Sequence, residues 1–185
     1  MKATPPDSTK QNAIAALEDA ALEQLRATGC IGSGVDMCSQ LIKVLIQPSF
    51  ESYKCYCVSK GTEGRYFGFR TIWRRDLDLQ IFEKTLWIGR KLEPTFEKQT
   101  VELEPTFVQG ALEKLRTLQL PVLSQNAPLI LDGTRIEVTL TIDCTSTFLW
   151  NTEAPPEWKL LEEITNQIID HINTNCSEQT ATETT

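Results

Sequence analysis

Histidine is nearly absent from this chain of 185 residues, which has only His171. Catalysis by a Ser–His or Cys–His pair needs a histidine base. His171 falls in the last turn of an expected helix, where the helix dipole favours a cation for structural reasons. No second histidine can help to hold a metal ion, and neither H-E-x-x-H nor G-x-S-x-G occurs. The sequence therefore favours a protein that is not an enzyme and uses no cofactor.

Long apolar runs are also missing. A signal peptide needs about 7–15 consecutive apolar residues, and the first 30 residues contain no such run. A membrane-spanning helix needs about 18 or more apolar residues. The longest candidate, residues 41–46, is interrupted by Lys43. We therefore expect a cytoplasmic protein with no membrane partner.

Basic residues are in deficit, because 18 Lys and Arg stand against 25 Asp and Glu, a net charge of −7. Since an acidic surface repels phosphate, nucleic acid is not an expected partner. The charges are unevenly placed: residues 60–91 hold eight basic and four acidic residues, whereas residues 101–185 hold four basic and thirteen acidic ones. This asymmetry favours a non-enzymatic protein-binding domain, of an adaptor or immunity type, whose acidic part attracts a basic protein partner.

The composition that is present is typical of a globular protein, with 41% hydrophobic and 23% charged residues. The patterning predicts an α+β fold, a mostly antiparallel sheet of about five to seven strands packed by three to four helices. A single α+β domain is expected over residues 10–173. A flexible tail (1–9) precedes it and a disordered polar tail (174–185) follows it.

Apolar periodicity predicts three helices. The first covers residues 10–27, the second begins at Pro105 and ends near Leu118, and the third follows Pro155–Pro156 and ends near Ile172. Proline is favourable at the first turn of a helix because the N–H that it lacks would have no partner there. Residues 36–47 fit either a short apolar helix or a buried strand, and periodicity does not decide between them.

Strands are predicted in two groups. Residues 50–59 and 65–75 form an expected hairpin across the turn 60–64. Leu77, Leu79 and Ile81 alternate with polar residues and predict a half-buried strand, followed by another at 85–91. The second group is a hairpin of residues 136–142 and 147–151, in which apolar and polar residues alternate clearly.

The stretch 84–172 combines several of these features. A basic strand is followed by a helix, then by Asp132-Gly133-Thr134 and an alternating strand, a strand that ends at Trp150, and Pro155-Pro156-Glu157-Trp158 at the start of the last helix. This order resembles a pattern seen in small uncharacterised bacterial α+β proteins. The resemblance implies a compact antiparallel sheet packed by helices and carries no assigned activity.

A basic strand face is the first candidate site. Arg70 and Arg74 point to one side of strand 65–75, and Trp73 and Arg75 point to the other with Phe67 and Phe69. Together with Arg90 they could form a small-ligand or anion-binding surface, an alternative to the protein-binding function. In the other interpretation the aromatic side belongs to the core and the arginines are its solvated back.

The six cysteines offer a second candidate. Cys55 and Cys57 form a C-x-C in a predicted strand, which places both thiols on one face. A thiol redox or metal-binding protein is therefore a further alternative. Zinc sites usually combine C-x-x-C pairs with a second pair or with histidines, and this chain has no C-x-x-C. The simpler interpretation is that the cysteines fill space in an apolar core.

Overall fold

The computed structural model describes residues 7–28, 39–85, 93–120 and 133–182. Over these residues the fold is one six-stranded antiparallel sheet with four α-helices, which confirms the predicted α+β class. The strands lie in the order β4-β3-β2-β1-β5-β6. The helices are α1 (Asp7–Ala27), α2 (Arg75–Thr85), α3 (Pro105–Thr117) and α4 (Lys159–Thr182), the last preceded by a 3₁₀ turn at Pro156–Trp158. The strands are β1 (Ser39–Pro48), β2 (Lys54–Lys60), β3 (Tyr66–Trp73), β4 (Phe96–Leu103), β5 (Thr134–Thr141) and β6 (Thr145–Asn151).

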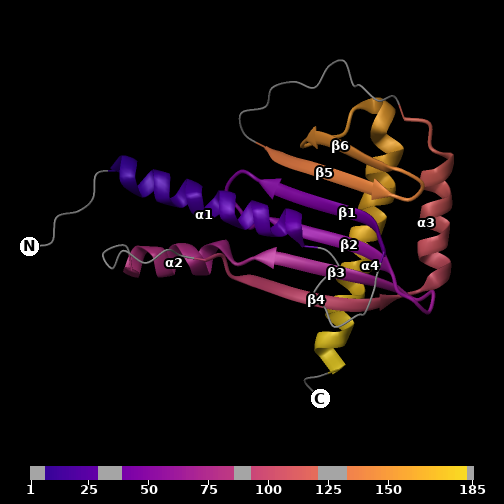
Figure 1. Cartoon of the computed structure of the whole chain (residues 1–185), viewed down its shortest axis with the longest axis horizontal. Helices are drawn as coiled ribbons and strands as arrows, with labels where there is room; N and C mark the ends of the chain where they lie inside the picture. Colours follow the sequence, from indigo (N-terminus) through magenta and orange to yellow (C-terminus); the bar gives the residue numbers. More distant parts are fainter. Residues whose placement is uncertain (1–6, 29–38, 86–92, 121–132, 183–185) are drawn as a thin grey trace, which may run out of the picture.

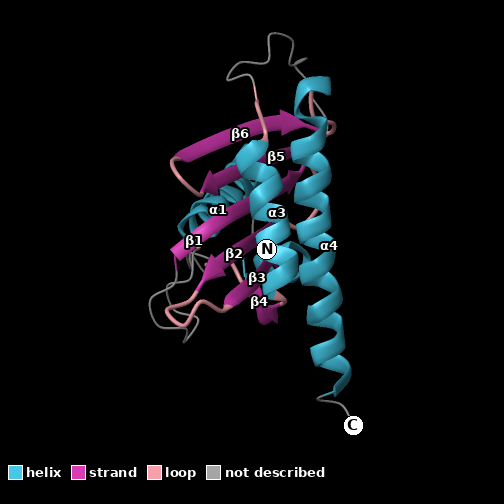
Figure 2. Cartoon of the chain, turned by 90° about the vertical axis from the view of Figure 1, so that its right-hand side faces the viewer, coloured by secondary structure: helices cyan, strands magenta, loops and turns pink. Residues whose placement is uncertain are grey.

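Helices cover both faces of the sheet (Figure 1). α3 and α4 lie together on one face, and α1 lies on the other (Figure 2). β1 is in the middle of the sheet, so Val44 packs into the core under α4 while Leu45 packs under α1. A strand buried on both faces has no polar alternation, which explains why residues 36–47 were ambiguous as a sequence.

The larger core lies between the sheet and the helices α3 and α4. The predicted apolar stripes of both helices are buried in it: Val108, Ala111, Leu112 and Leu115 of α3, and Leu161, Ile164, Ile168 and Ile172 of α4. Gly68 of β3 allows this close approach, because a Cβ there would lie 2.9 Å from Ile172 Cγ1 and 3.1 Å from Leu103 Cδ2.

The smaller core lies under α1. Its buried members are Leu17, Ala21, Leu25, Leu45, Cys55, Cys57, Phe69 and Trp73. Polar contacts fix both ends of the helix: Lys43 Nζ donates to the carbonyl of Arg26, and Lys10 lies 3.4 Å from Glu83 of α2. The N-terminal part of α1 therefore runs beside α2 (Figure 1).

The predicted strand at Leu77, Leu79 and Ile81 is wrong, because these residues belong to α2. Asp78 explains the error. Its carboxylate is fully buried and accepts hydrogen bonds from Trp73 Nε1 at 2.7 Å and from the Thr95 N–H at 2.8 Å. Asp78 is polar but buried, so in the sequence it looks like a solvent-exposed position. Leu77, Leu79 and Ile81 then appear to alternate with polar residues, and this apparent period of two hides the helix face on which Asp78 and Phe82 are buried.

Other boundaries also differ from the prediction. β4 was not predicted, and the strand expected at 85–91 falls almost wholly on residues outside those described. The tail 174–185 was expected to be disordered, which is wrong as far as Thr182, where α4 ends. Most residues in this part of α4 are polar, but Cys176 is buried against the sheet and gives the helix an apolar contact there. None of the helices in the described residues has the length and apolar character needed to span a bilayer.

Candidate functional site

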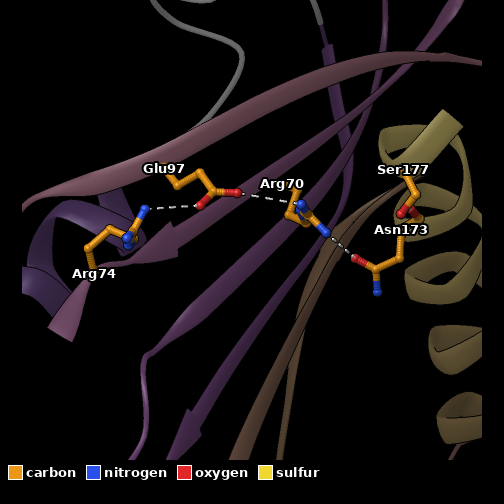
Figure 3. Close-up of polar contacts among 5 residues, drawn as sticks. All are labelled: Arg70, Arg74, Glu97, Asn173 and Ser177. Atoms are coloured by element: carbon orange, nitrogen blue, oxygen red, sulfur yellow. Dashed lines mark hydrogen bonds and ion pairs between the residues drawn. The ribbon is translucent and has the colours of Figure 1, made fainter. Parts of the chain in front are cut away.

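The predicted basic face is divided between the two sides of the sheet. Arg70 lies under the C-terminal part of α4, where Nη1 donates to Asn173 Oδ1 at 3.1 Å (Figure 3). Its Nη2 lies 3.6 Å from Glu97 Oε1, and Arg74 Nη1 lies 3.4 Å from the other oxygen of the same carboxylate. The structure thus brings Arg70 and Arg74 together through Glu97 of β4.

Trp73 and Arg75 belong to the opposite side, under α1. Trp73 has no exposed surface, so no ligand can stack on its ring in this structure. The Arg75 guanidinium donates twice to Glu18 Oε1, at 2.9 and 3.3 Å, and once to the carbonyl of Phe50. Arg90 lies outside the described residues. An anion would therefore have to compete with Glu97 or Glu18 for the arginines that are described.

Two further groups near Arg70 have raised pKa values. Burial raises the pKa of the Tyr56 hydroxyl, although a hydrogen bond with Asn173 and the charge of Arg70 act against it. Burial likewise raises the pKa of the Cys176 thiol. This arrangement suits a structural connection from β3 and β4 to the end of α4. Sequence reasoning found Arg70 but missed Glu97 and Asn173, because β4 was not predicted and Asn173 is 103 residues away.

Cys55 and Cys57 lie side by side on the α1 face of β2, both buried. Their sulfurs are 3.9 Å apart, and Cys57 Sγ lies 4.0 Å from the carbonyl oxygen of Thr28. The hydrogen bond from Cys57 lowers the pKa of the Cys55 thiol, and the Lys43 ammonium adds to this effect against the opposing effect of burial. The sequence prediction that both thiols share one face is consistent with this geometry.

A disulfide between these two thiols does not suit an extended strand. Residues two apart on a strand have Cβ atoms about 6–7 Å apart. A disulfide needs a Cβ separation of about 3.5–4.5 Å. A disulfide between Cys55 and Cys57 would therefore require the backbone of β2 to depart from the extended conformation in which it pairs with β1 and β3.

The two edges of the sheet provide a third candidate, which sequence reasoning did not find. β4 carries Glu97, Lys98 and Glu102, whereas β6 has no charged residue in its seven positions. The described residues place no strand beyond either edge (Figure 2). Thr152 N donates to the Thr134 carbonyl, so the register assigns the even-numbered residues of β6 to the ladder with β5. Thr145, Thr147, Leu149 and Asn151 consequently direct their backbone groups away from the sheet.

Acidic side chains flank β6 at both ends. Asp143 precedes the strand with 78% of its side chain exposed, and Glu153 and Glu157 follow it, both exposed. Arg116 approaches Asp143 at 3.8 Å, but an ion pair this exposed contributes little. The result is an uncharged strand edge between two negatively charged ends.

Comparison of the chain with protein-family models, curated proteins and solved structures finds no match. The resemblance to small bacterial α+β proteins therefore stays a prediction.

Proposed function

We propose that this chain is a non-enzymatic protein-binding domain that pairs the edge of β6 with an extended segment of a basic partner protein. The observation that carries the proposal is the absence of charge from β6, set against three charged residues on β4. Sheet edges are normally protected by charged residues, because unpaired backbone groups attract other strands. An edge that lacks this protection is suited to strand addition.

The backbone of β6 offers a ladder of limited length. A partner strand can bond to the outward N–H and C=O groups of Thr145, Thr147 and Leu149. The Asn151 carbonyl already accepts the Glu153 N–H at 2.7 Å, so the ladder ends there. Leu149, with 43% of its surface exposed, adds an apolar contact beside the strand. The binding segment is therefore short, with apolar or β-branched residues at its centre.

Charge favours basic residues at the two ends of the bound segment. Asp143 and Glu153 stand on either side of β6, and both are exposed. Lysine or arginine in the partner would meet these carboxylates and speed the encounter with an acidic protein. Such pairs lie at the rim of the interface, so they should respond to salt.

A second copy of this chain is a poorer occupant of the same edge. If two β6 strands paired antiparallel about Phe148, Asp143 of each copy would lie opposite Glu153 of the other. Like charges directly opposite one another destabilise a strand pair. The net charge of −7 on each copy adds to the repulsion.

Two model peptides test the chemistry of the partner. Both have a centre of alternating threonine and valine, one with lysines at its ends and the other with glutamates. We expect the lysine peptide to bind the full chain at least about 10-fold more tightly, measured by fluorescence anisotropy, with an advantage that shrinks as salt is added. No binding by either peptide, or equal binding by both, would overturn the proposal.

Two matched variants test the location. Thr100 of β4 and Thr147 of β6 end one cross-strand row that passes through Phe69, Cys57, Lys43 and Thr139. Both threonines are exposed, and both direct their N–H away from the sheet. Proline at either position removes an outward donor and leaves the ladder intact.

Thr147→Pro should abolish peptide binding, and Thr100→Pro should leave it unchanged. Thr147→Pro also loses a 3.3 Å hydroxyl contact with Thr139, so thermal unfolding of both variants provides the control for folding. Loss of binding in both variants, or in neither, contradicts the assignment to β6. Sedimentation should show a monomer, and a wild-type dimer that Thr147→Pro dissociates would identify a second copy as the occupant instead.

A further inference from the structure

One cross-strand row on the α4 side of the sheet changes from polar to apolar between the two edges. Its members, in order from β4 to β6, are Gln99, Arg70, Tyr56, Val44, Val138 and Phe148. The row ends on β6 at Phe148, which packs against the larger core but is only half-buried. A strand added to β6 would extend this row by one residue, directly beside the aromatic ring.

The ladder determines how closely that added residue approaches Phe148. The even-numbered residues of β6 bond to β5, so Phe148 would exchange no backbone hydrogen bonds with a strand on its other side. In an antiparallel pair, such positions have the shorter Cα separation, about 4.5 Å instead of about 5.5 Å. The bound residue opposite Phe148 therefore makes a closer side-chain contact than the residues opposite Thr147 and Leu149.

We infer, on the basis of the proposed strand addition, that Phe148 selects a β-branched or aromatic apolar residue at the centre of the bound segment. Cross-strand pairs of an aromatic with a β-branched or a second aromatic residue stabilise antiparallel strands. The Phe148 ring is held in place, because Trp158 lies edge-on to it with a centroid distance of 5.4 Å. Threonine has nearly the shape of valine, but its hydroxyl gains no partner from this ring.

The opposite face of the added strand has different surroundings. Thr145, Thr147 and Leu149 are exposed on the α1 side of β6. Among the described residues, the apolar cluster under α1 takes no member from β5 or β6. Side chains of the bound segment that face this side stay in water and can be polar. The segment is therefore two-sided, with its apolar centre directed toward the α4 side.

Two peptides with lysine ends test this selection. Both have a threonine centre, and one of them carries a single valine in its middle position. We expect the valine to tighten binding to the wild-type chain by about 3–5-fold, measured by fluorescence anisotropy. The preference should fall below about 1.5-fold in Phe148→Thr and survive in Phe148→Leu, because leucine keeps the position apolar. Leu149→Ala is the matched control and should keep the full preference, since Leu149 lies on the other face of β6.

Three results would overturn the inference and leave strand addition standing. They are equal binding of both peptides to the wild type, a valine preference that persists in Phe148→Thr, and a preference that is lost in Leu149→Ala. If neither peptide binds the wild type, strand addition itself fails and the selection fails with it. Thermal unfolding of each variant shows whether the fold is intact. The comparison on the wild-type chain needs no variant, so the inference can be refuted even if Phe148→Thr does not fold.

Discussion

The two edge strands of the sheet, β4 and β6, each pair with one neighbouring strand but differ in their side chains. β4 is charged, and its Glu97 is paired with Arg70 and Arg74. α4 packs across β4 as well (Figure 2). β6 has no charge and is held by aromatic rings: Phe148 and Trp150 lie edge-on to Trp158 with centroids 5.4 and 6.4 Å away. Because both strands end the same sheet, the side chains and not the topology distinguish a protected edge from one open to a partner strand.

Removing the aromatic anchor of β6 should have the largest effect. Trp150 is buried in the main core, so Trp150→Ala should lower the free energy of unfolding by about 3–5 kcal/mol, measured by chemical denaturation. Peptide binding should be lost at the same time. Leu149 directly precedes Trp150 and lies on the other face of the sheet, where it is exposed. Leu149→Ala should therefore change the free energy of unfolding by less than about 0.5 kcal/mol. A stable Trp150→Ala variant would show that other contacts hold this edge.

Adding a side-chain atom at Gly68, on the β4 side of the sheet, should lower the free energy of unfolding by an intermediate amount. Gly68→Ala places a Cβ against Ile172 and Leu103, so we expect a loss of about 1–3 kcal/mol in unfolding free energy. Peptide binding at β6 should persist under native conditions, because Gly68 lies on β3, at the far side of the sheet. Gly110→Ala is the matched control: nothing lies within 4 Å of its new Cβ, and alanine in α3 should stabilise the chain by about 0.5–1 kcal/mol. Equal effects from both substitutions would contradict the close packing at Gly68.

The sequence predicted the elements that bury one side only. The stripes of α3 and α4 and the alternation of β5 were recognisable because burial on one face leaves a clear period. No clear hydrophobic period is seen where an element is apolar on both faces or buries a polar residue. β1 is apolar on both faces, and α2 buries an aspartate. The polar end of α4 is held by Cys176, which composition alone does not reveal.

The candidate sites were less predictable than the fold, because they depend on how distant segments meet. The shared face of Cys55 and Cys57 follows from a spacing of two, so it could be predicted. The pairing of Arg70 with Glu97 and Asn173 joins three elements and has no local signal. The exposed edge of β6 depends on the strand order, which the hairpin pattern of β5 and β6 does not specify.

Alkaline pH should lower the free energy of unfolding by less than the substitutions above, and it should weaken the part of the sheet near β4 first. Burial raises the pKa of Tyr56 on β2 and of Cys176 on α4, and both groups lie near Arg70. A raised folded-state pKa contributes stability that is present below the unfolded pKa and is lost as the pH rises through the folded pKa. Stability should therefore decline above about pH 9–10, the ordinary range of the Cys and Tyr side chains.

Tyr56→Phe isolates one part of this decline. The variant lacks the hydrogen bond to Asn173 and should be slightly less stable at pH 7, yet it should lose less stability than the wild type between pH 8 and pH 11. Chemical denaturation at these pH values measures the difference, and amide exchange should show β3 and β4 opening before β5 and β6. If the wild type and Tyr56→Phe decline in parallel, the Tyr56 hydroxyl does not drive the alkaline response. If β6 opens first, the edge that carries the proposed binding site is the weaker one, and the aromatic anchor at Trp158 fails before the connection made by Arg70.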